Sequence, residues 1–269
     1  MDFKRLTSGF IVGLALVVIL LIQSNLITGI LFTGISIIAM YEYLKAISKV
    51  CKPIKWIAYL SCIIVAVINY IPEKYLLSTL MFSIPTILLI LFAHVIATDM
   101  KITFKDVAYT LLGICYIPVF IMFLSLIDGM KNGKILLGYI FISAWGTDVF
   151  AYCIGIKFGK HTFSKVSPKK SIEGCIAGTI GAIIIALIYT LILNKAFSFE
   201  YSYFSIGIIV FVLSLIGQLG DFSASCIKRY VDIKDYSNLL PGHGGMLDRI
   251  DSVLFIAPFA YMLFIGMFL

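Results

Sequence analysis

The sequence has few charged residues: Asp, Glu, Lys and Arg make up 13% of its 269 residues, against about 25% in ordinary soluble domains. Hydrophobic residues make up 61% of the chain, and the mean hydropathy is +1.06. A soluble core cannot bury so much apolar surface, whereas a bilayer accepts apolar side chains on helices of about 20 residues. The composition therefore excludes a soluble globular enzyme and indicates one bundle of membrane-spanning helices.

The six cysteines lack the grouping that metal sites and disulfide frameworks need, because none forms a CxxC pair or lies in a His/Cys cluster. We interpret them as small packing residues. The sequence also lacks low-complexity tracts and internal repeats. No small-residue cleavage site follows the first apolar run, so we expect an uncleaved first helix rather than a signal peptide.

Nine apolar runs follow one another between charged or Pro/Gly-containing breaks. Their lengths suit membrane-spanning helices, although the third is short. The predicted fold class is an all-α integral membrane protein, a bundle of about nine transmembrane helices. The runs are residues 8–23, 25–44, 56–71, 75–97, 107–126, 135–156, 174–194, 203–225 and 251–269.

Basic residues predict the orientation of these helices, because Lys and Arg gather in cytoplasmic loops. With the N-terminus inside, only four of the 21 Lys and Arg residues fall outside, namely Lys74, Lys131, Lys134 and Lys195. We therefore predict a cytoplasmic N-terminus, an outside C-terminus and a multi-pass protein of the inner cell membrane. Its active site would face the cytoplasm.

Reactive side chains are spread unevenly along the chain. Residues 1–135 carry little chemistry, and we expect them to form a helical scaffold that is compatible with an oligomer contact. Residues 136–269 are expected to form the catalytic region, because they hold nearly all the reactive groups. Most of these groups lie in two cytoplasmic loops, 157–173 and 226–250, and in the helix ends beside them.

The first polar block begins with Asp148, about two thirds of the way along an apolar run. An unpaired carboxylate there would cost several kcal/mol, so we expect Asp148 to point into the bundle. A structural ion pair with a lysine is the alternative to a catalytic role. Two GxxxG spacings predict helix-packing surfaces and are compatible with a homodimer. They are formed by Gly155 with Gly159 and by Gly174 with Gly178.

The loop after this run is rich in lysine, a feature that is sometimes only a topology signal. The order of its residues favours phosphate binding. Ser167 and Pro168 predict a turn, and Ser171 is placed to cap the next helix, whose N-terminus favours anions. The predicted phosphate-binding residues here are Lys157, Lys160, Ser167, Lys169 and Lys170.

The second polar block runs from the eighth span into the ninth. Four residues fall on one helical face, Asp221, Ser225, Lys228 and Arg229. The Gly-rich turn at 241–245 allows backbone N–H groups to converge on a phosphate. The chain has only three arginines, and two of them, Arg229 and Arg249, lie in this block, which favours bidentate recognition of anions.

Three carboxylates, those of Asp148, Asp221 and Asp248, are oxygen donors with no thiol or paired imidazole nearby. Such donors select a hard cation such as Mg²⁺ over zinc. A proton-coupled transporter also buries carboxylates in its helices and is the main alternative to an enzyme. That alternative does not explain the Gly-rich and Lys-rich cytoplasmic loops.

Residues 225–251 resemble the signature of the phosphatidate cytidylyltransferases across its full length. The matching residues include Ser225, Lys228, Arg229, Lys234, Asp235, Pro241, His243, Gly244, Gly245, Asp248, Arg249 and Asp251. The earlier block, from Asp148 to Gly174, looks like a second region of the same family. The resemblance covers about residues 148–252.

The resemblance implies transfer of CMP from CTP to phosphatidic acid, which gives CDP-diacylglycerol and pyrophosphate in phospholipid biosynthesis. It implies Mg²⁺, with room for a second cation, and no nucleic-acid partner. Enzymes that act on polyprenyl lipids share parts of these motifs. A CTP-dependent transferase for a polyprenyl-type lipid is therefore the second interpretation.

The same resemblance implies roles for individual residues. Asp221 and Asp248 would hold the metal, with Asp148 and Asp251 as supporting acidic groups, and Lys169 and Lys170 would bind the triphosphate. The residues expected to take part in catalysis are Asp221, Asp248, Lys228, Arg249 and His243. Those expected to bind substrate are Lys157, Lys160, Ser167, Lys169, Lys170, Ser225, Arg229, Gly244 and Gly245.

Overall fold

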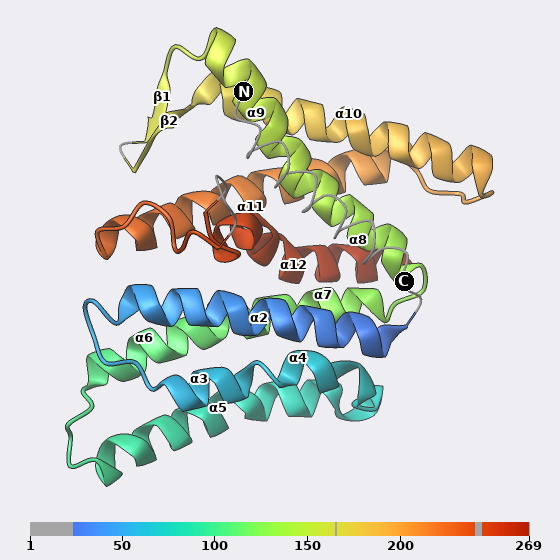
Figure 1. The fold of residues 1–269 in the computed structure, drawn as a ribbon. Helices are drawn as coiled ribbons and strands as arrows, with labels where there is room; N and C mark the ends of the chain where they lie inside the picture. The colour runs from blue at the N-terminus through green and yellow to red at the C-terminus, as the bar shows by residue number, and fades with distance from the viewer. Residues whose placement is uncertain (1–23, 165, 240–243, 269) are drawn as a thin grey trace. The chain divides into compact units, whose positions relative to one another are not determined.

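The computed structural model describes residues 24–164, 166–239 and 244–268, and most of these residues are helical (Figure 1). Seven helical stretches in these residues are long and apolar enough to cross a membrane. The structure thus supports the predicted all-α membrane protein. The first predicted span, residues 8–23, lies outside the described residues.

The candidate spans follow the apolar runs of the sequence closely. The exception is the run at 56–71, which is divided among α3 (Lys55–Ser61), α4 (Ile64–Val67) and the 3-10 helix η1 (Ile68–Tyr70). The single-helix spans are α2 (Asn25–Ile47), α5 (Glu73–Ala97), α10 (Ile172–Ala196), α11 (Tyr203–Tyr230) and α12 (Leu247–Phe268). Two spans are composite. The first consists of α6 (Phe104–Ile114), η2 (Cys115–Val119) and α7 (Phe120–Asp128). The second consists of α8 (Gly133–Phe141), η3 (Ile142–Gly146) and α9 (Thr147–Phe158).

A π-helical segment interrupts each composite span. In η2, Pro118 removes a backbone donor and its ring crowds the preceding turn, which explains the irregular hydrogen bonding there. The other segment, η3, ends at Gly146, two residues before Asp148. A π-turn holds more residues than an α-turn, so it changes the direction in which the following side chains point.

The chain forms two compact units. The first contains residues 1–131 and 230–249, and the second contains residues 132–229 and 250–269. The loop after α11 and the first residues of α12 therefore pack with the N-terminal helices. The sequence predicts a division of the chain at residue 135 into a scaffold and a catalytic region. That division concerns function rather than packing, and it stays a prediction.

In the first unit, α2 packs against α4, α6 and α7. Tyr43 of α2 is fully buried, and its hydroxyl donates a 2.9 Å hydrogen bond to the carbonyl oxygen of Tyr109. Gly113 lies against the Tyr43 ring, where a Cβ atom would come within 2.4 Å of a ring carbon. Farther along α2, Thr28 donates a hydrogen bond to Asp128, and both side chains are buried.

In the second unit, α9 and α10 lie side by side (Figure 1). A Cβ atom on Gly174 would come within 2.8 Å of the carbonyl oxygen of Ala151, and one on Gly178 within 2.7 Å of that of Thr147. These contacts confirm that this glycine pair is a helix-packing surface. Because the packing occurs within one chain, this glycine pair gives no support to a dimer.

Buried hydroxyl and amide groups tie α10 to α9 and α11 in the second unit. Ser214 on α11 lies 2.7 Å from the hydroxyl of Thr147 on α9 and donates to the hydroxyl of Thr179 on α10 at 3.0 Å. Gln218 donates to the same Thr179 hydroxyl at 2.9 Å. Polar groups that satisfy one another in an apolar surrounding fix the register of neighbouring helices.

Candidate active site

The lysine-rich loop contains a short antiparallel hairpin, β1 (Thr162–Ser164) and β2 (Ser167–Ser171). The turn predicted at Ser167 and Pro168 is therefore wrong. The fixed φ of proline suits an extended strand, and both strands of a two-stranded hairpin are edge strands where proline is tolerated. The predicted cap is confirmed, because the Ser171 hydroxyl accepts a 3.1 Å hydrogen bond from the Gly174 N–H.

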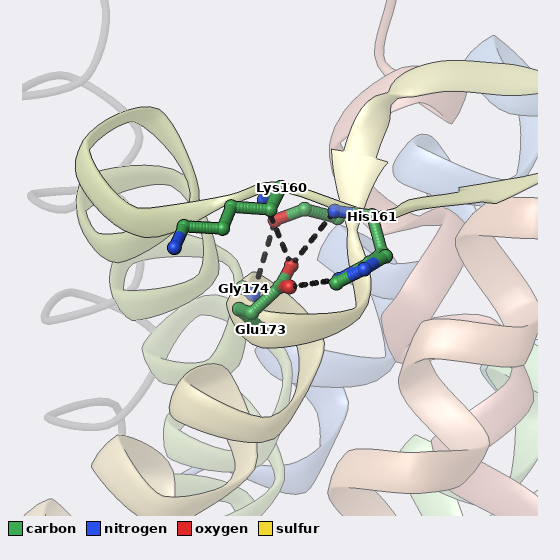
Figure 2. Close-up of polar contacts among 5 residues, drawn as sticks. Lys160, His161, Glu173 and Gly174 are labelled. Atoms are coloured by element: carbon green, nitrogen blue, oxygen red, sulfur yellow. Dashed lines mark hydrogen bonds and ion pairs between the residues drawn. The ribbon is translucent and has the colours of Figure 1, made fainter.

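Glu173, in the first turn of α10, holds the start of the hairpin in place (Figure 2). Its Oε2 atom accepts the backbone N–H groups of Lys160 at 3.1 Å and His161 at 3.3 Å. Its Oε1 atom lies 2.6 Å from Nδ1 of His161. Sequence reasoning did not assign Glu173 a role, although an acidic residue in the first turn of a helix is a common capping signal.

Lys170 at the end of β2 forms an ion pair with Asp221 on α11. Its ammonium also lies 4.7 Å from the centre of the Phe222 ring, a cation–π distance. The Phe163 ring of β1 stacks on Phe222 with centroids 4.7 Å apart and planes 19° apart. The structure thus brings together Lys170 and Asp221, two residues predicted from separate sequence blocks.

Three aspartates from three helices act on the Lys170 ammonium. Burial lowers the pKa of Lys170, but the charge and hydrogen bond of Asp221, followed by the charges of Asp148 and Asp251, raise it above its ordinary value of 10.5. Lys170 is therefore protonated at neutral pH. The charges of Asp221, Lys228 and Asp148 act in turn on Asp251, which is buried.

The predicted polar stripe on α11 has one buried and one exposed cation. Lys228 is buried with 9% of its surface exposed, whereas Arg229 is exposed. Asp221 and Ser225 are half-buried. In the hairpin region, Lys157 and Lys160 are exposed. Lys228 is also one of the charges that act on the buried Asp251.

The first unit holds the loop that leads into α12, and Asp248 closes that loop. Its Oδ2 atom accepts the backbone N–H groups of Tyr236 and Gly245, both at 2.9 Å. Gly244 has φ +79°, and a Cβ atom there would come within 3.0 Å of the same carboxylate oxygen. Glycine is needed at this position because other residues rarely adopt positive φ.

Glu42 of α2 is a second carboxylate that holds this loop, and it was missed in the sequence. Only 1% of its surface is exposed. It accepts the Ser237 hydroxyl at 2.5 Å and the N–H groups of Met246 at 3.0 Å and Leu247 at 2.7 Å. No role was assigned to this residue from the sequence. A lone acidic residue in the apolar run 25–44 was the available signal, the same one that drew attention to Asp148.

Two predicted site residues are not fully described. His243 lies outside the described residues, and Lys169 is described only as part of β2. Within the described ranges, no three His, Cys, Asp or Glu side chains are gathered closely enough to hold one metal ion.

Comparison with known proteins gives the family. The family model described as "Cytidylyltransferase family" matches residues 3–266, so the chain belongs to this family. The resemblance found at residues 148–252 is thereby confirmed, and the family model extends it to nearly the whole chain.

Similar proteins carry the name phosphatidate cytidylyltransferase. The one from Bacillus subtilis is 36% identical over 177 residues, which are 65% of this chain and 64% of that protein. The one from Thermotoga maritima is 36% identical over 180 residues, 65% of each chain. The one from Staphylococcus saprophyticus is 34% identical over 177 residues, 65% of this chain and 66% of that protein. The matched segment thus spans a little under two thirds of each of these relatives.

Proposed function

We propose that the chain is a phosphatidate cytidylyltransferase, which transfers CMP from CTP to phosphatidic acid and releases pyrophosphate. Family membership and the names of three relatives at 34–36% identity support this activity. The observation that carries the proposal is the Lys170–Asp221 pair, with two further aspartates acting on the same ammonium. Phosphoryl and nucleotidyl transfer depend on positioning and on neutralising phosphate charge, and this cluster supplies groups for both.

In this reaction an oxygen of the phosphatidate phosphate forms a bond to the α-phosphorus of CTP. The bond from that phosphorus to the bridging oxygen of pyrophosphate breaks, and its electron pair leaves with pyrophosphate. The attacking oxygen is already an anion at pH 7, so no strong general base is required. The main tasks of the protein are to align two anionic groups and to offset their charge.

The lysines of the hairpin are proposed to bind the triphosphate. Lys170 is protonated at neutral pH and reaches Asp221 through a flexible stem, so a phosphate oxygen can share or replace that carboxylate as its partner. Lys169 follows Pro168 in the same strand. Lys228, Arg229, His243 and Arg249 are proposed to contact the phosphates of either substrate.

The proposal of a divalent cation rests on the chemical type of the donor atoms. The aspartates that act on Lys170 offer only oxygen ligands, and Mg²⁺ prefers carboxylates together with substrate phosphates. Asp221 and Asp248 are proposed as metal ligands, with Asp148 and Asp251 as supporting acidic groups, and a second cation stays part of the proposal, as the resemblance implies. When bound, the ion would offset phosphate charge.

The proposed topology has nine spans, a cytoplasmic N-terminus and an outside C-terminus, in the inner cell membrane. It follows from the distribution of Lys and Arg, with four of 21 on the outer side. Single cysteines at Ser167 and Asn238, in a cysteine-free background, should resist impermeant thiol reagents in intact cells and react after lysis. Ready labelling in intact cells would overturn the orientation.

The test of activity is incubation of the purified protein with labelled CTP, Mg²⁺ and phosphatidic acid. We expect a lipid-soluble cytidine product and one pyrophosphate released for each cytidine transferred. Parallel reactions with a polyprenyl phosphate identify the acceptor class. Product from the polyprenyl lipid alone would replace the proposed acceptor, and solute uptake into proteoliposomes without nucleotide turnover would replace the enzyme by a transporter.

A further inference from the structure

We infer that Glu42 is a positioning residue, which holds Ser237 and the backbone of Met246 and Leu247 and thereby sets the place of Asp248. Its effect on turnover rests on the proposed function. Glu42 belongs to α2, almost 200 residues before that loop, yet its carboxylate accepts hydrogen bonds from Ser237, Met246 and Leu247. It therefore connects the N-terminal helices to the residues that begin α12.

The first argument is that the backbone N–H groups at the start of α12 need hydrogen-bond acceptors from outside the helix. The first N–H groups of any helix have no partner inside that helix and must be satisfied from elsewhere. At α12 two of these groups, those of Met246 and Leu247, donate to Glu42. A carboxylate also suits the positive end of the helix dipole. Glu42 thus acts as an N-terminal cap supplied by a different helix.

The second argument is the fit between Glu42 and Gly245. A Cβ atom on Gly245 would come within 2.6 Å of both carboxylate oxygens of Glu42. The N–H of the same glycine donates to Asp248 at 2.9 Å. Gly245 therefore contacts both carboxylates, and a shift of the Glu42 side chain would be passed on to Asp248 through one residue.

The third argument concerns where Glu42 makes its contacts. Within the part of the chain that the structure describes, its hydrogen bonds run to Ser237, Met246 and Leu247 and none to the other scaffold helices. Neighbouring residues of α2, such as Tyr43 and Leu44, bury their apolar side chains in the first unit. Those apolar residues therefore pack α2 in the first unit, while the Glu42 carboxylate accepts hydrogen bonds from Ser237, Met246 and Leu247.

The test compares Glu42→Gln and Glu42→Asp with wild type. Gln keeps the size of the side chain but places an NH₂ group against an N–H donor, so we expect kcat to fall about 10- to 100-fold, as for other groups that support metal ligands. The KM for CTP should change much less. Asp keeps the charge on a shorter stem and should restore part of the lost kcat.

The matched control is Thr28→Val, since Thr28 is also a buried polar residue of α2 that bonds another helix. We expect it to lower thermal stability and to leave kcat near the wild-type value. If folded Glu42→Gln protein keeps a near-normal kcat, or if Thr28→Val loses kcat to the same extent, the positioning role is wrong.

Amide hydrogen exchange gives a second readout that does not depend on activity. The amides of Met246 and Leu247 should exchange faster in Glu42→Gln than in wild type, and at wild-type rates in Thr28→Val. Unchanged exchange in Glu42→Gln would overturn the inference. If wild-type protein makes no cytidine lipid, the proposed function fails, and amide exchange alone then decides whether Glu42 holds the loop.

The variant Gly245→Ala tests the same link without changing residue 42. The added methyl group would push the Glu42 carboxylate away from its hydrogen-bond donors, so this variant should show both the loss of kcat and the faster amide exchange. Gly34→Ala on α2 is its control, because a Cβ atom there meets nothing within 4 Å. Wild-type kcat in Gly245→Ala would contradict the proposed link between Glu42 and Asp248.

Discussion

The carboxylates of the two units have different kinds of partner. In the second unit, Asp221 is paired with the ammonium of Lys170, and the charges of two further aspartates act on the same group. In the first unit, Asp248 and Glu42 accept mainly backbone N–H groups. A lysine can change partners by rotating its side chain, whereas a backbone N–H can leave its acceptor only when the chain moves.

This difference indicates two separate tasks for the carboxylates. The charged groups around Lys170 are able to exchange partners when anionic substrates arrive. The carboxylates of the first unit hold the backbone of Tyr236 and of residues 245–247. Substitutions of similar chemistry in the two units should therefore differ in their effects on binding, turnover and local order.

The largest expected effect comes from Asp221→Asn and Asp248→Asn. Each substitution keeps the shape of the side chain and removes the charge that would offset a cation, so kcat should fall more than about 100-fold, beyond the 10- to 100-fold cost of changing supporting groups. Amide exchange should distinguish the two variants. Asp248→Asn should expose the amides of Tyr236 and Gly245, whereas Asp221→Asn should leave them protected.

The measurement is steady-state turnover at saturating substrates, made on protein shown to be folded by its thermal transition. If either variant kept near-normal kcat, the metal assignment of that aspartate would be lost. If the amides of Tyr236 and Gly245 exchanged equally fast in both variants, the proposed difference between the two units would be wrong.

The helical spans could be predicted from the sequence because the bilayer imposes a length on apolar segments. Residues 172–196, for example, were expected as a span at 174–194, and the Ser171 cap that starts this helix was also foreseen. Such signals are local, since they depend on residues three or four positions apart. Lys170 and Asp221 were also chosen individually from their surroundings.

Contacts across long separations could not be predicted in this way. Glu42 accepts hydrogen bonds from residues about 200 positions later, and no sequence pattern predicts partners at such a separation. The strand at Ser167–Ser171 was missed because Ser-Pro favours turns as well as extended edge strands. The π-helical segment before Asp148 was missed because the 3.6-residue period assumes an uninterrupted α-helix.

A smaller effect is expected from Lys170→Gln and Lys169→Gln. Each removes one charged donor to the triphosphate, and a hydrogen bond to a charged group contributes about 1.5–3 kcal/mol. The KM for CTP should therefore rise about tenfold or more, with a much smaller change in the KM for phosphatidic acid. Initial rates with each substrate varied in turn give both constants.

Lys195→Gln is the control for these lysine variants, because Lys195 lies in the last turn of α10 and on the side predicted to face outside. Its kinetic constants should match those of wild type. Lysine variants of the hairpin that weakened binding of phosphatidic acid alone would show that the hairpin serves the lipid rather than the nucleotide.

The smallest effect is expected from Phe222→Leu, which tests whether the hairpin needs its aromatic support. The Phe222 ring stacks on Phe163 and lies beneath the Lys170 ammonium, both at 4.7 Å. A partly exposed cation–π contact contributes about 0.5–1 kcal/mol, so loss of the contact with Lys170 should raise the KM for CTP about twofold to fivefold. Leucine keeps the apolar volume near Asp221, and kcat should therefore stay close to that of wild type. Phe204→Leu on the same helix is the matched control, because the Phe204 side chain is 78% exposed and should alter neither constant. Equal effects of the two substitutions would show that the ring beneath Lys170 does not position it for nucleotide.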